Sequence, residues 1–349
     1  MDAPHWHGAC SCPPVPPQCR GIATLLSLSL AAFLLAPRGH ATGESARGEL
    51  DAALAFSRTA ARATARIGAS VVSVRAFAAG REEFGSAVIV EESGLALTAL
   101  HVVAASSAVA VITRDGEEFP ARLRGRDGSL DLALLEILAP GRRFPVALLA
   151  DEAEHDLGES VLVVGNPFGL GGSVSLGVLA GRGRTGIVTG CRAPMLQTDA
   201  AINPGCSGGA LGNLHGEVLG LVDAILTRDG RSHGIGFAIP ASELRYALPF
   251  LVKGEPVTRP WLGIVVRPVV GLEEGLSVTA VTPDGPGLKA GVRVGDVLLR
   301  LGESRLGGLD ELRHALRRLD AGQQVALGLR RGPKLLTLDL VVEARVDAD

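Results

Sequence analysis

Lysine, aromatic side chains and long apolar runs are all scarce in this chain. Only three of its 34 basic residues are Lys, the aromatic content is 3%, and the net charge is −3. Without an excess of positive charge there is no field to attract phosphates, so a nucleic-acid partner is not expected. The 46 Gly among 349 residues follow no fixed period, which excludes collagen, and an apolar content of 47% excludes a disordered chain. The composition favours a turn-rich β protein of two or three domains.

The one sustained apolar run lies near the N-terminus, at residues 21–36. It is shorter than the roughly 20 residues that a membrane-spanning helix needs. Arg20 precedes it and small residues ending at Ala41 follow it, which is typical of an export signal. We therefore expect cleavage after Ala41. If cleavage does not occur, the same run would act as an N-terminal anchor in the inner membrane.

Cysteine is also sparse, and its distribution predicts no metal site. The leader holds three of the five Cys together with two His, at spacings that fit no standard zinc pattern: Cys10, Cys12, Cys19, His5 and His7. The exported part would keep only Cys191 and Cys206. An oxidising compartment would allow a disulfide between them, but the sequence does not reveal their separation. We expect two free thiols.

The sequence pattern changes after residue 68, from helical spacing to short β-branched runs. Leu50, Leu54 and Ala61 recur at helical spacing and predict a helix over residues 44–66. About ten short β-branched runs then follow, with no alternating helices, which indicates an antiparallel barrel or sandwich. A polar break around Gly254 begins a separate domain of about 90 residues. The predicted division is a leader at 1–41, a helical segment at 42–68, a β domain at 69–254 and a C-terminal domain at 255–349.

A serine between glycines is the main candidate for chemistry. Ser207 follows Gly205 and Cys206 and precedes Gly208 and Gly209. Glycines permit the tight path that turns successive N–H groups toward one point, and an activated serine needs such donors for the oxyanion of an attacked carbonyl. By itself the segment could equally be a turn, because a serine nucleophile also needs a base.

Two further residues supply the missing groups. His101 ends an apolar strand-like run, and Asp131 opens another. Read separately, His101 fits a hydrogen-bonded core residue and Asp131 a strand-start carboxylate. The order His101, Asp131, Ser207 matches one of the known chain orders of a Ser-His-Asp triad.

At these residues the sequence resembles the HtrA/Deg family of trypsin-like serine proteases, over about residues 66–345. Five blocks in order carry the resemblance: 97–103, 130–135, 164–169, 197–211 and 234–240. The glycines near Asn166 precede no Lys-Ser/Thr pair, so they predict no nucleotide site and no cofactor. The resemblance implies a mainly β fold with two perpendicular six-stranded antiparallel barrels, followed by a PDZ domain.

The resemblance also implies the catalytic roles. Ser207 would be the nucleophile, His101 the general base and acid, and Asp131 the residue that orients the imidazole. Backbone N–H groups of Gly205 and Ser207 would form the oxyanion hole. One departure is Cys206, where the family usually has Asn. The Gly-x-Ser-Gly-Gly frame still favours Ser207 over Cys206 as the nucleophile.

Two regions would select the substrate. Val222, Asp223, Ala224 and Ile225 stand where the family tends to carry Asn-Thr-Ala-hydrophobic, so Ile225 is expected to narrow the specificity pocket around small aliphatic residues. The C-terminal domain resembles a PDZ domain, in which N–H groups of Leu262, Gly263 and Ile264 would bind a peptide C-terminal carboxylate. An ordinary β-turn before a strand is the other reading of that loop.

These features predict an ATP-independent serine endopeptidase of the cell envelope, regulated through its PDZ domain and acting on misfolded or signalling proteins. The resemblance implies a bacterial periplasmic location and a homotrimer assembled through N-terminal segments. The alternative is a proteolytically inactive chaperone or a peptide-binding scaffold.

Overall fold

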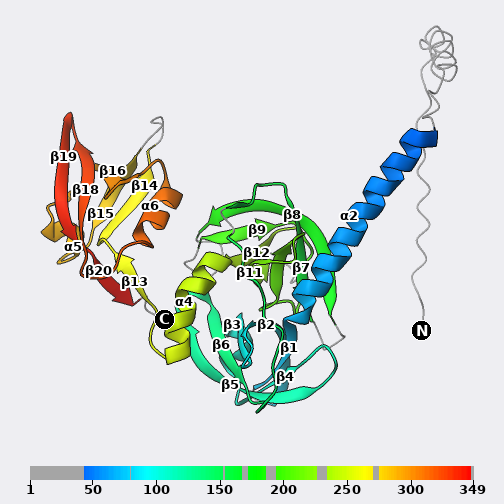
Figure 1. Ribbon diagram of the computed structural model, residues 1–349. Coiled ribbons are helices and arrows are strands. Elements are labelled where there is room, and N and C mark those ends of the chain that lie inside the picture. The colour runs from blue at the N-terminus through cyan, green and yellow to red at the C-terminus, as the bar shows by residue number, and fades with distance from the viewer. Residues whose placement is uncertain are drawn as a thin grey trace, which may run out of the picture. The chain divides into compact units, whose positions relative to one another are not determined.

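The computed structural model (Figure 1) describes most of the chain after the leader. Its described residues are 43–78, 80–151, 154–166, 172–185, 194–225, 234–269 and 275–346. The predicted leader, its apolar run and Cys191 therefore lie outside them. The chain divides into two compact units, residues 1–56 and 57–349. Within the part of the chain that is described, no helix is both long and apolar enough to cross a membrane.

The predicted N-terminal helix is present as α2, Gly43–Ala69, and extends a few residues beyond the expected end. In its first half, Leu50 and Leu54 are exposed at 58% and 43%. In its last turns, Ala63 and Ile67 are buried in the core of the larger unit. The helix ends where the Ser70 hydroxyl donates a hydrogen bond of 2.8 Å to the Ile67 carbonyl.

The β domain consists of two closed six-stranded antiparallel barrels rather than a sandwich. In the first barrel the strand order is β1-β2-β3-β6-β5-β4, and apolar side chains of alternating position fill its interior. A short helix, α3, follows β3, and a 3₁₀ turn, η2, precedes β6. The bounds are β1 Val71–Ala78, β2 Arg81–Glu91, β3 Leu95–Ala99, α3 Leu100–Val103, β4 Ala108–Ile112, β5 Glu118–Asp127, η2 Gly128–Leu130 and β6 Leu132–Ile137.

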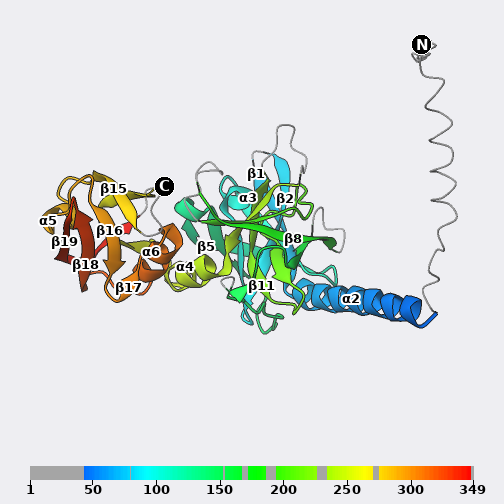
Figure 2. The same cartoon turned by 90° about the horizontal axis from the view of Figure 1, so that it is seen from above.

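The second barrel has the order β10-β11-β12-β9-β8-β7. Helix α4, Ala241–Lys253, packs against β5 of the first barrel and β11 of the second (Figure 1, Figure 2). Its buried face, including Leu244, Ala247 and Leu251, joins a core shared by both barrels. The strands are β7 Ser160–Gly165, β8 Ser173–Arg184, β9 Met195–Thr198, β10 Ala210–Asn213, β11 Val218–Ile225 and β12 Gly236–Pro240.

The C-terminal residues form a smaller β domain with its own core around Leu276, Leu298 and Leu327. Its main sheet has the order β14-β15-β16-β18-β19, so β14 lies at an edge. A two-stranded ribbon of β13 and β20 pairs the first and last strands of the domain. The bounds are β13 Thr258–Trp261, β14 Ile264–Pro268, β15 Leu276–Val281, α5 Pro286–Lys289, β16 Val297–Leu301, β17 Ser304–Arg305, α6 Leu309–Leu316, β18 Gln324–Arg331, β19 Lys334–Val341 and β20 Glu343–Val346.

Candidate active site

Asp131 is presented by the turn between β5 and β6. Asp127 is the last residue of β5. Its carboxylate accepts hydrogen bonds from the Ser129 N–H at 3.1 Å and from the Ser129 hydroxyl at 2.7 Å, and these bonds stabilise the 3₁₀ turn. Asp131 follows that turn at φ 54°, a left-handed conformation that Asp tolerates better than most residues. Its carbonyl accepts a hydrogen bond of 2.7 Å from the Leu100 N–H, so the turn is bonded to the end of β3.

His101 lies beside this carboxylate because β3 and β6 are paired with Ala99 opposite Leu132. The His101 N–H donates to Asp131 Oδ1 at 2.9 Å, and His101 Nδ1 is hydrogen-bonded to Asp131 Oδ2. One carboxylate thus holds both the backbone and the ring of His101. With Nδ1 bonded to Asp131, Nε2 is the nitrogen left for a substrate or nucleophile proton, and the side chain is half exposed.

The Asp131 carboxyl is kept ionised by its neighbours. Burial alone would raise its pKa, but the hydrogen bond from the His101 side chain, the facing Asp223 carboxyl and the His101 charge lower the pKa below its ordinary value. An ionised carboxylate at this position can stabilise an imidazolium on His101.

Ser207 lies on a loop of the second barrel that is bonded to the first. The Ser86 N–H donates 2.8 Å to the Ser207 carbonyl, and the Ser86 hydroxyl donates 2.7 Å to the Gly205 carbonyl. The same hydroxyl accepts from the Asn166 N–H at 2.9 Å. Sequence reasoning missed Ser86, whose only signal was a small polar residue within an apolar strand. It is fully buried in β2 and joins the two barrels at the loop.

Two glycines give the Ser207 loop a tight path. Gly205 and Gly208 have φ of 92° and 83°, which favour glycine. A Cβ on Gly208 would collide with the Ser86 carbonyl oxygen, so a larger residue does not fit. Among the described residues, the N–H groups of Gly205 and Ser207 have no backbone acceptor, whereas the Gly208 N–H donates to Val222.

The nucleophile candidate and the base candidate are not hydrogen-bonded to each other in this structure. The Ser207 hydroxyl donates 3.1 Å to the backbone carbonyl of Asp223, and no hydrogen bond joins Ser207 to His101 within the described part of the chain. A rotation of the Ser207 side chain away from Asp223 is therefore part of any attack that uses His101 as the base.

Asp223 is the residue that sequence reasoning left unassigned. Its side chain is fully buried, and its Oδ1 lies 3.9 Å from His101 Nδ1. Burial, the facing Asp131 carboxyl and repulsion by the Asp131 charge raise the pKa of Asp223 to about 9. The available signal was an acid within the otherwise apolar run Val218–Ile225.

His101, Asp131 and Asp223 also bring three ligand-type atoms within 4.8 Å of one another. A divalent cation at that point would need both carboxyl groups ionised and open coordination sites around them. The Asp223 carboxyl is instead buried with a raised pKa, and Nδ1 of His101 is already bonded to Asp131. These residues do not fit a metal site.

The structure describes Cys206, but it does not describe the side chain that was expected to narrow the specificity pocket. Cys206 is a free thiol that is 4% exposed, and burial raises its pKa, so it stays protonated. A Cβ on Gly165 would meet Cys206 at 3.1 Å, which shows how closely the two segments approach. Ile225 ends β11, but its side chain lies outside the described residues, so its role in a pocket stays a prediction.

The predicted carboxylate loop lies between β13 and the edge strand β14. Gly263 has φ 69°, and a Cβ there would meet Pro286 at 2.9 Å. The carbonyls of Leu262 and Gly263 accept hydrogen bonds from Gly287 and Thr282, both at 2.8 Å. This holds the loop while β14 keeps one free edge, where a peptide could add as a further strand.

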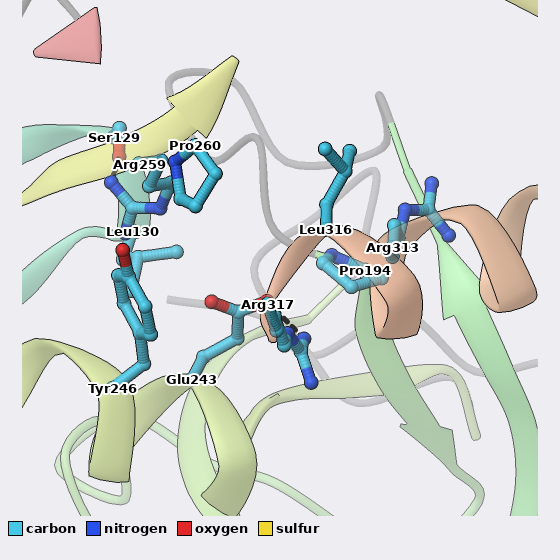
Figure 3. A pocket seen from close by; sticks show the side chains of 10 residues that line it. All are labelled: Ser129, Leu130, Pro194, Glu243, Tyr246, Arg259, Pro260, Arg313, Leu316 and Arg317. Carbon is cyan, nitrogen blue, oxygen red and sulfur yellow. Dashed lines mark hydrogen bonds and ion pairs between the residues drawn. The ribbon is translucent and has the colours of Figure 1, made fainter. Parts of the chain in front are cut away.

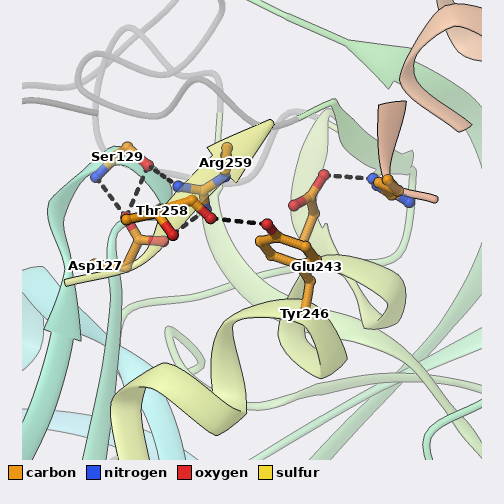
Figure 4. A network of polar contacts seen from close by, with 7 residues as sticks. Asp127, Ser129, Glu243, Tyr246, Thr258 and Arg259 are labelled. Carbon is orange, nitrogen blue, oxygen red and sulfur yellow. Dashed lines mark hydrogen bonds and ion pairs between the residues drawn. The ribbon is translucent and has the colours of Figure 1, made fainter. Parts of the chain in front are cut away.

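A polar network joins the C-terminal domain to the turn before Asp131 (Figure 4). Arg259 donates 2.6 Å to the nearly buried Asp127 carboxylate and 3.1 Å to the Ser129 hydroxyl. Tyr246 of α4 donates 2.7 Å to the Thr258 carbonyl. The carboxylate that holds the 3₁₀ turn therefore has its charge neutralised by a residue of β13.

A cavity of about 180 Å³ lies beside this network (Figure 3). Glu243 of α4 pairs there with Arg317, which also donates 2.8 Å to the Ser242 hydroxyl. The cavity is separate from the His101 and Ser207 side chains. It is lined by Ser129, Leu130, Pro194, Glu243, Tyr246, Arg259, Pro260, Arg313, Leu316 and Arg317.

Comparison with known proteins agrees with this architecture. A family model described as a trypsin-like peptidase domain matches residues 85–221, and one described as a PDZ domain matches residues 260–342. The chain is 37% identical over 269 residues to a probable periplasmic serine endoprotease, DegP-like, of Brucella suis, covering 74% of this chain and 52% of that protein. A protein of the same description from Rhizobium meliloti is 39% identical over 267 residues, with 74% and 53% covered. The chain thus spans about half the length of these relatives.

Solved structures match over a larger share of their own length. An HtrA-type protease, AlgW with tripeptide, is 32% identical with a TM-score of 0.72, covering 82% of this chain and 98% of that one. A serine endoprotease from Yersinia pestis is 31% identical with a TM-score of 0.60, covering 81% and 97%. The fold and the site define a trypsin-like peptidase domain followed by a PDZ domain. More specifically, the chain belongs to the HtrA-type serine protease family.

Proposed function

We propose that this protein is an ATP-independent serine endopeptidase, with His101, Asp131 and Ser207 as its catalytic residues. The observation that carries the proposal is that Asp131 forms hydrogen bonds with both the backbone and the ring of His101. The loop that carries Ser207 is hydrogen-bonded to the same barrel. The Ser207 hydroxyl turns from the Asp223 carbonyl to His101 Nε2, which takes its proton as the oxygen attacks a peptide carbonyl. His101 then returns that proton to the leaving amine.

The N–H groups of Gly205 and Ser207 would stabilise the oxyanion that forms during this attack. Their freedom from backbone acceptors among the described residues supports this role. A donor of this kind contributes about 3 to 4 kcal/mol to the transition state in comparable enzymes. The positive φ of Gly205 and of Gly208 supports a tight loop path that could present both donors to the oxyanion.

Substrates would be misfolded or signalling proteins, and peptide C-termini would bind at the PDZ domain. The free edge of β14 and the glycine-dependent loop of Leu262, Gly263 and Ile264 support this mode of binding. The related AlgW structure was solved with a tripeptide, which also supports peptide binding. Periplasmic location is supported by the names of the DegP-like relatives and by the expected export signal.

We also infer a homotrimer formed through the N-terminal helix. Exposed Leu50 and Leu54 lie one turn apart on α2 and would be covered in such an assembly.

Hydrolysis of casein by the purified protein and by Ser207→Ala, each with and without a peptide carrying a free C-terminal carboxylate, tests the activity. We expect hydrolysis by the first protein and none by the variant. Equal cleavage by both proteins, or labelling of neither by a fluorophosphonate probe, would favour the chaperone or scaffold alternative. A C-terminally amidated peptide is the matched control for the PDZ domain.

A further inference from the structure

Asp223 lies at a β-bulge next to the catalytic residues. Strand β11 pairs with β12 in regular register up to Val222, and the register shifts between Val222 and Ala224, so Asp223 is the extra residue. A bulged residue is not paired in the ladder, and its side chain can be redirected. Here the carboxyl turns inward, with its side chain fully buried, while its carbonyl receives the Ser207 hydroxyl at 3.1 Å.

If the buried carboxyl of Asp223 is ionised, no donor among the described residues forms a hydrogen bond with it. Neither oxygen of Asp223 receives a hydrogen bond from any donor in the described part of the chain. A carboxylate oxygen of Asp131 lies within 4.8 Å, but it is an acceptor as well. A single proton on one of the two carboxyl groups converts this facing pair of acceptors into a donor and an acceptor.

Among the described residues, no Lys or Arg forms an ion pair with the Asp223 carboxyl. Strands β3, β10 and β12 contain no ionisable side chain. On α4, Glu243 is paired with Arg317, and Arg245 donates to the carbonyls of Leu149 and Ala150. His101 Nδ1 lies 3.9 Å from Asp223 Oδ1 but is bonded to Asp131, so the proton belongs on the more buried Asp223.

We propose that Asp223 is a positioning residue of the active site: it remains protonated at neutral pH, donates a hydrogen bond to Asp131, and holds the resting Ser207 hydroxyl through its own carbonyl. This inference rests on the proposed peptidase activity. During attack the Ser207 O–H bond breaks and its proton passes to His101 Nε2, while Asp223 keeps its own proton. The raised pKa of Asp223 agrees with this assignment.

Ionisation of Asp223 would then disturb the site at alkaline pH. Asp131 would lose a donor and face a second negative charge, so His101 would no longer be held in one orientation. We expect the kcat of peptide hydrolysis to fall above about pH 9 as this proton is lost. The KM should change little, because the Asp223 side chain is fully buried.

Three variants test this with pH profiles of kcat and KM on one peptide substrate. Asp223→Asn keeps a neutral donor and should retain near-normal kcat while losing the alkaline fall. Asp223→Ala removes the donor and should lower kcat roughly tenfold or more at neutral pH, as loss of a hydrogen bond to a charged group does. Asp115→Asn makes the same chemical change at an exposed position of the first barrel and should keep the profile of the unmodified protein.

Superimposable profiles for the unmodified protein and Asp223→Asn would overturn the proposal, as would full kcat in Asp223→Ala. Loss of activity in EDTA would also overturn it, because a cation rather than a proton would then lie between the carboxyl groups.

A second readout needs no proteolysis. The folded protein holds the Asp223 proton more tightly than the unfolded chain, so the Tm advantage of Asp223→Asn should widen from about pH 4 to about pH 9.

A Tm difference that is constant over this range would contradict protonation of Asp223 in the fold. If the widening is seen but no variant cleaves any substrate, the proposed peptidase activity fails while the protonated carboxyl stands. The two failures are therefore distinguishable.

Discussion

Cys206 and Ser207 are adjacent nucleophile-type residues with opposite environments. Cys206 points into the second barrel, where it packs beside Gly165 and burial raises the pKa of its thiol. Ser207 is half-buried on its loop, with its hydroxyl bonded to the Asp223 carbonyl. The thiolate is the reactive form of cysteine, so burial makes Cys206 inert although it is chemically the stronger nucleophile.

We therefore expect selective labelling in the folded protein. A fluorophosphonate should modify Ser207 and abolish peptide hydrolysis, whereas iodoacetamide should leave activity unchanged and label Cys206 only after denaturation. Intact-protein and peptide mass spectrometry measure both outcomes. Cys206→Ser is the control for thiol labelling, and rapid alkylation of native Cys206 with loss of activity would contradict the assignment.

At the scale of elements, the turn from β5 to β6 depends on contacts from distant strands. Asp127 holds η2 through Ser129, and its charge is neutralised by Arg259 of β13. The PDZ sheet has a comparable pair, in which Arg331 of β18 donates 2.7 Å and 2.8 Å to the buried Asp296. In both cases a buried carboxylate is tolerated because an arginine from another element pairs with it.

Replacing Arg259 by Ala should destabilise the protein. Asp127 is 5% exposed at its side chain, and it would keep a nearly buried charge without its arginine. We expect a loss of about 3 kcal/mol in the free energy of unfolding, as when one partner of a buried pair is removed. Chemical denaturation of Arg259→Ala, Asp127→Asn and the double variant forms a cycle. Strictly additive losses would show that the two side chains do not interact.

Asp296 gives a prediction about pH. The Arg331 hydrogen bond, aided by the Arg293 N–H, lowers the pKa of Asp296 below its unfolded value. The stabilisation is therefore fully present above the unfolded pKa of about 3.9 and is lost as the pH falls through the folded pKa. Asp296→Asn should be less stable than the unmodified protein near pH 7, and the two should converge in acid.

Unfolding by urea at about pH 7 and about pH 3 measures this convergence. Asp339→Asn, at an exposed position of β19, is the control and should follow the unmodified protein at both pH values. A gap for Asp296→Asn that stays constant with pH would contradict the ion pair as its cause.

At the scale of the whole molecule, the chain combines a double barrel, a PDZ domain and an N-terminal helix with an apolar stripe. The barrels and the PDZ domain each bury a continuous core. The first half of α2 does not, since Leu50 and Leu54 remain exposed. Apolar side chains one helical turn apart favour contact with another copy of the same helix.

Leu50→Glu combined with Leu54→Glu should convert the proposed trimer to a monomer at micromolar concentration, because charge would replace the two exposed leucines. Sedimentation equilibrium measures the mass. Ala52→Glu combined with Ala55→Glu places the same charges on other faces of the helix and should leave the trimer intact. A monomeric unmodified protein would remove the expectation altogether.

Much of this organisation was predictable from the sequence. Strand runs, the order of His101, Asp131 and Ser207, and the glycines around the serine are local patterns, and the resemblance to the HtrA/Deg family that they carry implied a double-barrel peptidase with a PDZ domain. The strand runs alone indicated about ten strands in a barrel or a sandwich, and the structure closes twelve strands into the two six-stranded barrels that the resemblance implied. Closure is a property of pairing between distant strands, which periodicity within one strand does not contain.

What the tertiary structure alone decided lies at the contacts between distant segments. Ser86 and Gly205 are 119 positions apart, and Arg259 and Asp127 are 132 apart. No local sequence pattern therefore predicts either hydrogen bond. In the sequence, Asp223 is an acidic residue that interrupts an apolar strand. Only the bulge in β11 and the packing of the two barrels place it beside Asp131. The sequence by itself determined which chemical groups are available; burial and charge in the folded chain decided which of them hold a proton.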